Sequence, residues 1–236
     1  MGNILSYILH IIFPVRCPAC GRLAVPFCGE CLSEAAAFPL PPFCPECGGP
    51  YGVDCCSESL PCYAAAAHEG AARRLLLALK YSNVRALGEA IGKEMAYRFP
   101  DIAADCIVPV PLHPDSTRAY NQTALISRGI SAARDIAVAE NMLSWRRSRG
   151  RQTARRGAER KILSLDSMEA SSALTGKRVI LVDDVYTTGS TIRAALAALR
   201  RAGADVAAVF LWTRRLAGED PAAWPGYAEE DDFWYN

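Results

Sequence analysis

RVILVDDVYTTGSTIRAALAAL occupies residues 178–199 and joins three patterns in one stretch. The apolar run 179–182 favours a buried strand. Ile192, Leu196 and Leu199 then recur at helical spacing, which predicts a helix that begins near Ser190. A strand, a short turn and a helix in this order are typical of parallel α/β sheets, so this stretch decides the fold class.

The junction between the predicted strand and helix is rich in groups that bind sugars and phosphates. Ligands of parallel sheets bind beyond the carboxyl ends of the strands, where Asp183 and Asp184 fall. Carboxylates hold a polyol or a hydrated Mg²⁺, and the free N–H groups at the start of a helix favour an anion. The residues that we expect around a phosphate are Thr187, Thr188, Gly189, Ser190 and Thr191. The pattern predicts a site for a ribose 5-phosphate unit.

The chain before and after this stretch continues the alternation of strands and helices. Residues 106–112 and 205–213 are short apolar runs that favour strands. Apolar residues at helical spacing in 69–99 and 122–137 predict helices. We therefore expect an α/β fold with a parallel sheet flanked by helices, preceded by a small cysteine-rich module.

Composition and charge say little about binding partners, but they argue against a membrane-spanning segment. With 236 residues, 51% of them hydrophobic, the chain can bury a substantial core, and its net charge of +1 neither favours nor excludes nucleic acid. The apolar run 4–13 is shorter than the roughly 20 residues of a membrane span and lacks secretory-signal features. We expect a cytoplasmic protein without stable membrane insertion, in which this run packs on the protein as a helix or touches a membrane peripherally.

The first cysteine set predicts a structural zinc site. Nine of the ten cysteines lie in the first 62 residues, and a shift of 27 residues maps Cys-Pro-x-Cys-Gly at 17–21 onto 44–48. Zinc prefers four tetrahedral Cys or His ligands, and each CxxC turn supplies two. The four ligands that we predict are Cys17, Cys20, Cys28 and Cys31. Free or redox-active thiols are the alternative.

The second set repeats the first but fails at its fourth position. Its first three ligands would be Cys44, Cys47 and Cys55, and Glu58 stands where the fourth cysteine is expected. Cys56, Glu58 and Cys62 are the candidates for the fourth ligand. We favour Cys62, because adjacent cysteines at 55 and 56 bind one ion only with strain. A degenerate repeat held by packing is the alternative to a second structural zinc.

VILVDDVYTTGST (179–191) resembles the signature that binds phosphoribosyl pyrophosphate (PRPP) in type I phosphoribosyltransferases. The resemblance implies that Asp183 and Asp184 hold the ribose hydroxyls and that residues 187–191 wrap the 5-phosphate. It also implies Mg²⁺ bound with PRPP, and it places pyrophosphate near the loop VPVPLHPD (108–115). Lys80 and Arg118 are the cations that we expect to contact that pyrophosphate.

The order of the motifs is similar to that of ComF-type proteins over roughly residues 10–215. It comprises the double zinc-ribbon repeat, LLLALKYSN (75–83), VPVPLHPDSTRAYNQ (108–122) and the PRPP signature. Proteins of this type are bacterial and associated with DNA uptake in natural competence. The resemblance therefore implies a role in competence or nucleotide metabolism, with single-stranded DNA and competence or DNA-processing proteins as further partners.

Two classes of function remain open. As an enzyme, the protein would be a pentosyltransferase that displaces pyrophosphate from C1 of PRPP; as a non-catalytic factor, it would use the same fold to handle single-stranded DNA. The stretch 146–161, with eight basic residues and one acid, suits a solvated loop, a lid over pyrophosphate or a nucleic-acid contact. We expect three parts: a zinc-ribbon module (1–67) with a short apolar helix, a phosphoribosyltransferase-like domain (68–216) and an acidic tail (217–236).

Overall fold

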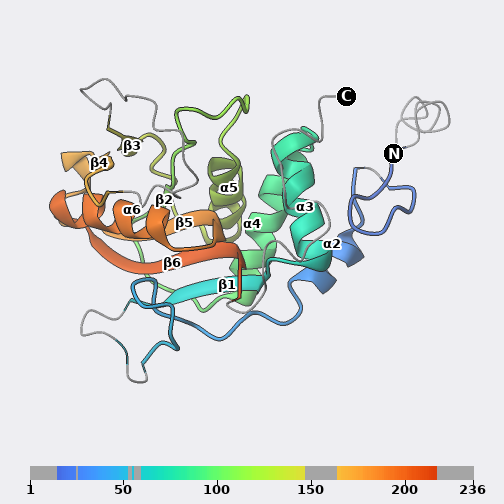
Figure 1. The fold of residues 1–236 in the computed structure, drawn as a ribbon, viewed down its shortest axis with the longest axis horizontal. Coiled ribbons are helices and arrows are strands. Elements are labelled where there is room, and N and C mark those ends of the chain that lie inside the picture. Colours follow the sequence, from blue (N-terminus) through green and yellow to red (C-terminus); the bar gives the residue numbers. More distant parts are fainter. Residues whose placement is uncertain (1–14, 25, 53–54, 56–59, 147–163, 217–236) are drawn as a thin grey trace, which may run out of the picture.

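The computed structural model describes residues 15–24, 26–52, 55, 60–146 and 164–216. Its main sheet has four parallel strands in the order β1-β6-β5-β2. These strands are β1 (Cys62–Ala67), β2 (Cys106–Pro109), β5 (Arg178–Tyr186) and β6 (Asp205–Arg214). The predicted parallel α/β sheet is therefore confirmed (Figure 1).

Helices cover both faces of this sheet. Side chains of β5 alternate, so that Ile180 and Val182 join one core cluster and Val179 and Leu181 the other. The first cluster contains α3 (Gly70–Tyr81), α4 (Ala86–Arg98) and α5 (Gln122–Arg134), whereas the second contains α6 (Ser190–Arg201). Figure 1 shows α6 in front of the sheet, with α3, α4 and α5 behind it and to the right.

Two glycines let α4 and α5 approach closely. A Cβ atom added to Gly92 would collide with the backbone of Ile126, and one added to Gly129 would collide with the backbone of Glu89. This contact fixes the start of α5, which follows the loop after β2 and carries residues of the candidate site.

The two cysteine segments occupy different places on the domain. The first includes α2 (Gly29–Ala35), and its Cys17, Cys31 and Leu32 share the core cluster of α3 and α4. In Figure 1 this segment lies at the right, and the second lies below the sheet at the left. Strand β1 falls within the range 1–67 that we assign to the zinc module, yet it is an edge strand of the main sheet. The cysteine segments are thus built onto the sheet rather than set apart from it.

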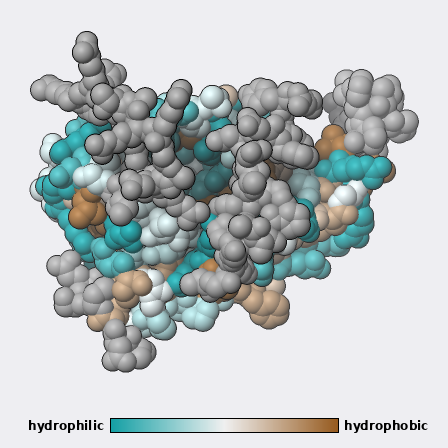
Figure 2. Space-filling model, viewed as in Figure 1, coloured by the Kyte–Doolittle hydropathy of each residue, from teal (hydrophilic) through white to brown (hydrophobic). Residues whose placement is uncertain are grey.

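A small antiparallel pair joins β3 (Leu143–Trp145) to β4 (Met168–Ala170), and a 3₁₀ helix (Ser172–Leu174) follows. The stretch 147–163 between these strands, the apolar run 4–13 and the acidic tail lie outside the described residues. The described surface in Figure 2 is largely hydrophilic, with separate hydrophobic patches. Within the described ranges, no helix has the length and apolar character that a membrane span requires.

Candidate functional site

A cavity of about 280 Å³ opens at the carboxyl ends of β5 and β2. It collects side chains from α3, the loop after β2, the start of α5, β3 and the segment after β5. The residues that line it are Lys80, Val110, Pro111, Leu112, His113, Arg118, Asn121, Gln122, Thr123, Trp145, Asp183, Asp184, Val185, Thr187 and Thr191. Six of the predicted ligand-binding residues therefore meet in one cavity: Lys80, Arg118, Asp183, Asp184, Thr187 and Thr191.

The two aspartates lie inside β5 rather than after it, because the strand continues to Tyr186. Asp183 is buried, with 8% of its surface exposed, and its Oδ1 accepts a hydrogen bond of 2.8 Å from the backbone N–H of Asp184. Burial, together with the neighbouring Asp184 carboxylate, raises the pKa of Asp183 to about 7. Asp183 can therefore hold a proton near neutral pH and donate it to a ligand oxygen.

Asp184 has a cation beside it. Lys80, in the last turn of α3, places its Nζ 3.1 Å from Oδ1 of Asp184, and both side chains are largely buried. On the neighbouring strand β6, the Thr213 hydroxyl lies 3.5 Å from the Asp184 carbonyl oxygen and 2.9 Å from Nδ1 of His68. Burial lowers the pKa of His68 to about 4, so this histidine is neutral at physiological pH. The sequence did not single out His68 or Thr213.

The predicted phosphate turn connects β5 to α6. Gly189 takes a left-handed conformation with φ 73°, and α6 begins at the next residue. The hydroxyl oxygens of Thr188 and Ser190 lie 3.0 Å apart, and the Gly189 carbonyl accepts a hydrogen bond from the N–H of Arg193. The first N–H groups of α6 therefore lie beside the cavity, where they favour an anion. Thr188, Gly189 and Ser190 belong to this turn but do not line the cavity itself.

Arg118 and the loop after β2 form the opposite wall. The Nε of Arg118 donates a 3.0 Å hydrogen bond to the Ser116 hydroxyl, which holds the guanidinium at the cavity. The Trp145 indole donates to the Pro111 carbonyl at 3.1 Å and packs edge-on against His113. This wall thus combines one cation with an aromatic surface.

Three residues at the start of α5 also line the cavity, although the sequence analysis gave them no role. Asn121 caps the helix by accepting from the Thr123 N–H, and its Nδ2 donates to the Val110 carbonyl. Thr123 hydrogen-bonds to the Asp183 carboxyl group. Gln122 is 1% exposed, and within the described part of the chain its Nε2 has no hydrogen-bond partner. A polar Asn-Gln-Thr run directly before the apolar residues 124–126 was the available signal.

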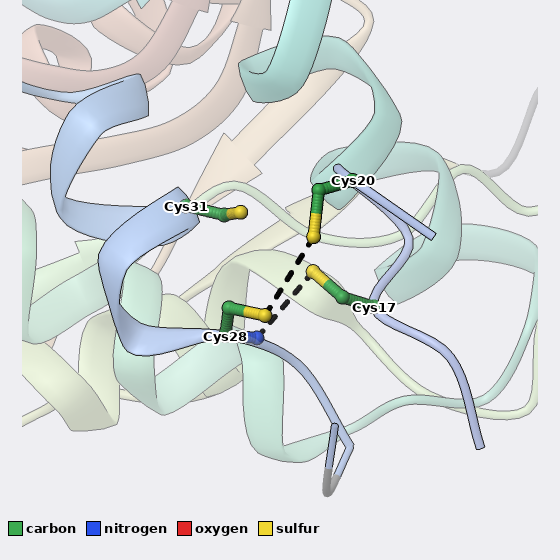
Figure 3. Close-up of side chains that lie close together, drawn as sticks. All are labelled: Cys17, Cys20, Cys28 and Cys31. Carbon is green, nitrogen blue, oxygen red and sulfur yellow. Dashed lines mark hydrogen bonds between the residues drawn. The ribbon is translucent and has the colours of Figure 1, made fainter. Parts of the chain in front are cut away.

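The first cysteine set converges as predicted. The sulfur atoms of Cys17, Cys20, Cys28 and Cys31 all lie within 4.8 Å of one another (Figure 3). The Cys28 N–H points at the Cys17 sulfur at 3.4 Å, and a hydrogen bond from Arg22 lowers the pKa of Cys20 to about 6. The pKa of Cys17 is lowered as well, and four converging thiols fit a closed, tetrahedral zinc site.

The second set brings together three of its four predicted ligands. The sulfurs of Cys44, Cys47 and Cys55 lie within 4.8 Å of one another. The structure does not bring Cys62 into this group. Its backbone pairs with Phe43, next to Cys44, but its side chain is fully buried in β1. Cys56 and Glu58, the other candidates for the fourth ligand, lie outside the described residues. Three converging thiols fit a zinc ion that takes its fourth ligand from elsewhere.

Comparisons with known proteins agree with this site. Residues 116–231 match the family model of the phosphoribosyl transferase domain. Orotate phosphoribosyltransferase of Bradyrhizobium sp. (strain ORS 278) is 39% identical over 56 residues, which cover 24% of this chain and 30% of the relative. That of Bordetella pertussis (strain Tohama I) is 34% identical over 110 residues, which cover 46% and 42%. The matches thus span less than half the length of either relative.

Among solved structures, the glutamine PRPP amidotransferase of B. subtilis complexed with ADP and GMP is 24% identical, with a TM-score of 0.42. The likeness covers 58% of this chain and 30% of that chain. Together with the family match, the parallel sheet confirms the expected phosphoribosyltransferase-type α/β fold.

Proposed function

We propose that this chain, of which residues 116–231 match the family model of the phosphoribosyl transferase domain, binds PRPP, or another ligand with a 5-phosphoribosyl group, in the cavity at the end of β5. The observation that carries the proposal is that Asp183 and Asp184 of β5 and Thr187 and Thr191 of the phosphate turn line one cavity. The carboxylates suit ribose hydroxyls, and the N–H groups at the start of α6 suit the 5-phosphate.

The two cations of the cavity suit a pyrophosphate group. Lys80 and Arg118 supply positive charge there, and Mg²⁺ bound with PRPP would neutralise more of the pyrophosphate charge. We propose that the reaction is transfer of the phosphoribosyl group, with pyrophosphate leaving C1 as an acceptor attacks. Positioning by the turn and the carboxylates would supply much of the rate, since no covalent nucleophile is required.

Calorimetry with ribose 5-phosphate, and with PRPP and Mg²⁺, tests the binding proposal. We expect the double variant Asp183→Asn with Asp184→Asn to lose at least about tenfold in affinity, because hydrogen bonds to charged groups contribute roughly 1.5–3 kcal/mol each. The double variant Asp135→Asn with Asp205→Asn removes two charges outside the cavity and serves as the control. Equal affinities for the wild type and the cavity variant would refute the ribose assignment.

Release of pyrophosphate tests whether the site is catalytic. The curated relatives are orotate phosphoribosyltransferases, so orotate heads a screen of nucleobases as acceptors. Pyrophosphate release that requires one acceptor would support a transferase. Binding of PRPP without release by any acceptor would favour a binding module.

A second candidate function is the handling of single-stranded DNA, as the resemblance to ComF-type competence proteins implies. The supporting observation is that Trp145, on the cavity wall, directly precedes the basic stretch 146–161.

Four arginine–phosphate contacts would give a slope near −3 for log affinity against log salt, at about −0.7 per contact with single strands. We expect replacement of Arg146, Arg147, Arg155 and Arg156 by Ala to flatten this slope and leave ribose 5-phosphate binding nearly intact. Loss of PRPP affinity with an unchanged slope would instead assign the stretch to a pyrophosphate lid.

A further inference from the structure

Two side chains, Tyr186 and Arg193, lie against the phosphate turn at Gly189, and Tyr186 is the nearer. Its hydroxyl lies so close to Gly189 that a Cβ atom at that glycine would stand 2.5 Å from it. Tyr186 is buried, with 6% of its surface exposed, and its ring packs edge-on against Phe43 at 4.9 Å between centroids. The backbone of the turn therefore depends on where this ring and its hydroxyl lie.

The hydroxyl of Tyr186 is held by the second cysteine segment. It donates a hydrogen bond of 3.1 Å to the carbonyl oxygen of Pro45, which lies between Cys44 and Cys47. Around these cysteines the chain forms a tight turn, in which Gly48 N–H donates to the Cys44 carbonyl and Cys44 N–H to the Gly49 carbonyl. A metal bound to the two thiolates would fix the same turn, and with it the Pro45 carbonyl.

Two further contacts dock this segment beside the site. Arg214, at the end of β6, donates to the Gly48 carbonyl and stacks 3.7 Å from the centre of the Phe43 ring. Arg200 of α6 lies 3.5 Å from the Glu46 carboxylate. The first cysteine segment contacts a different part of the domain, where Arg74 of α3 donates to the Ala19 carbonyl. Among the described residues, the second segment thus contacts the turn directly through Tyr186.

We propose that Tyr186 is a positioning residue that couples metal binding at Cys44, Cys47 and Cys55 to the geometry of the phosphate turn. This rests on the proposed function for the nature of the ligand, but the coupling itself concerns the protein alone. Coupling between two sites is reciprocal, so a phosphate ester bound at the turn also strengthens metal retention at the second cluster. The second cluster is then part of the binding site in energetic terms, although it contributes no atom to the cavity.

Three variants of the full chain separate this coupling from general destabilisation. Tyr186→Phe removes the hydroxyl and keeps the ring. Cys47→Ser and Cys20→Ser each remove the exposed second cysteine of a Cys-Pro-x-Cys turn, one in each cluster, and thus form a matched pair. Metal content, hydrogen exchange of the 187–194 amides without ligand and affinity for ribose 5-phosphate are measured for each.

We expect Tyr186→Phe and Cys47→Ser to accelerate exchange at 187–194 and to weaken ribose 5-phosphate binding about fivefold, as one hydrogen bond commonly does. Tyr186→Phe retains its full metal content, and combining it with Cys47→Ser adds no further loss of affinity. Cys20→Ser loses metal but keeps wild-type exchange at the turn.

Two results would overturn the coupling: unchanged exchange at 187–194 in Cys47→Ser, or additive losses in the double variant. Faster exchange in a protein that binds no ribose 5-phosphate even as wild type would leave the coupling standing. That result would refute the proposed function instead.

Discussion

Lys80 and Asp184 form an ion pair of 3.1 Å between α3 and β5, in which both side chains are largely buried. The pair gives two adjacent aspartates different surroundings, because Asp184 faces a cation while Asp183 is enclosed beside Thr123. The carboxylate pair is therefore asymmetric before any ligand arrives.

Lys80→Met should destabilise the protein by about 3 kcal/mol at pH 8, since removing one partner leaves a buried charge without compensation. Lys80→Arg, which keeps the charge, should cost much less. Adding Asp184→Asn to Lys80→Met should restore part of the loss. Urea denaturation of the four proteins measures these differences, and a double variant no more stable than Lys80→Met would show that the pair is not coupled.

Asp183→Asn should change the pH dependence of stability. The folded-state pKa of Asp183 is raised from 3.8 to about 7, so the folded protein binds more protons than the unfolded chain in that window. The contribution of Asp183 to the free energy of unfolding therefore falls as pH rises from about 4 to 7. Asparagine cannot ionise, and each pKa unit of difference between the folded and unfolded states corresponds to about 1.4 kcal/mol. We expect the free energy of unfolding of the variant, minus that of the wild type, to be at least about 1 kcal/mol larger at pH 8 than at pH 4. Denaturation of both proteins at both pH values measures this difference.

Gln122→Leu should trade affinity for stability. Its buried Nε2 lines the cavity without a partner among the described residues, so an apolar side chain of similar size should stabilise the free protein by up to about 1 kcal/mol. We expect weaker binding of ribose 5-phosphate or PRPP in the same variant. Ser127→Ala is the control, because that buried hydroxyl also lacks a partner there but does not line the cavity. Equal effects of the two variants on affinity would remove Gln122 from the ligand contact.

Gly189→Ala should damage the turn more than its backbone conformation alone requires. Gly176 has nearly the same φ, 71° against 73°, but a Cβ atom there would meet nothing within 4 Å. Gly176→Ala thus measures the conformational cost, about 1–2 kcal/mol. We expect Gly189→Ala to lose at least about 1 kcal/mol more, together with ribose 5-phosphate affinity, in thermal and calorimetric measurements. A cost no greater than that of Gly176→Ala would show that the Tyr186 hydroxyl moves aside freely.

Metal removal should unfold the first cysteine segment, because the binding free energy of structural zinc is largely folding free energy. We expect one to two zinc ions per chain by elemental analysis. Cys17→Ser should destabilise more than Cys20→Ser, since Cys17 is buried in the core with α3 whereas Cys20 is exposed. Well under one zinc per chain in purified protein would contradict this.

The sequence predicted the elements whose patterns are local. The apolar run before Asp183 and the helical spacing after Ser190 suffice to place β5 and α6. Strand β1, with the sequence CYAAAA, carries no such pattern, and it is a strand only because β6 pairs with it from far along the chain. Cys62 lies in this strand and outside the group of converging thiols, which the repeat alone could not reveal.

The site was predicted in part for the same reason. The two aspartates and the phosphate turn are neighbours in the sequence, so the sequence alone predicts that they lie at one site. Gln122 and the Tyr186–Pro45 contact join segments that only the folded sheet brings together.

Strand β1 also sets an order of assembly during synthesis. Among the described strands, its only partner in the main sheet is β6, which comes last of them in the chain, so β1 stays unpaired in this sheet until about residue 214 has left the ribosome. Pairing over so long a sequence separation is slow, and an unpaired strand edge invites association with other chains. The four consecutive alanines at 64–67 expose little apolar side-chain surface while β1 is unpaired, which reduces its tendency to associate with another nascent chain.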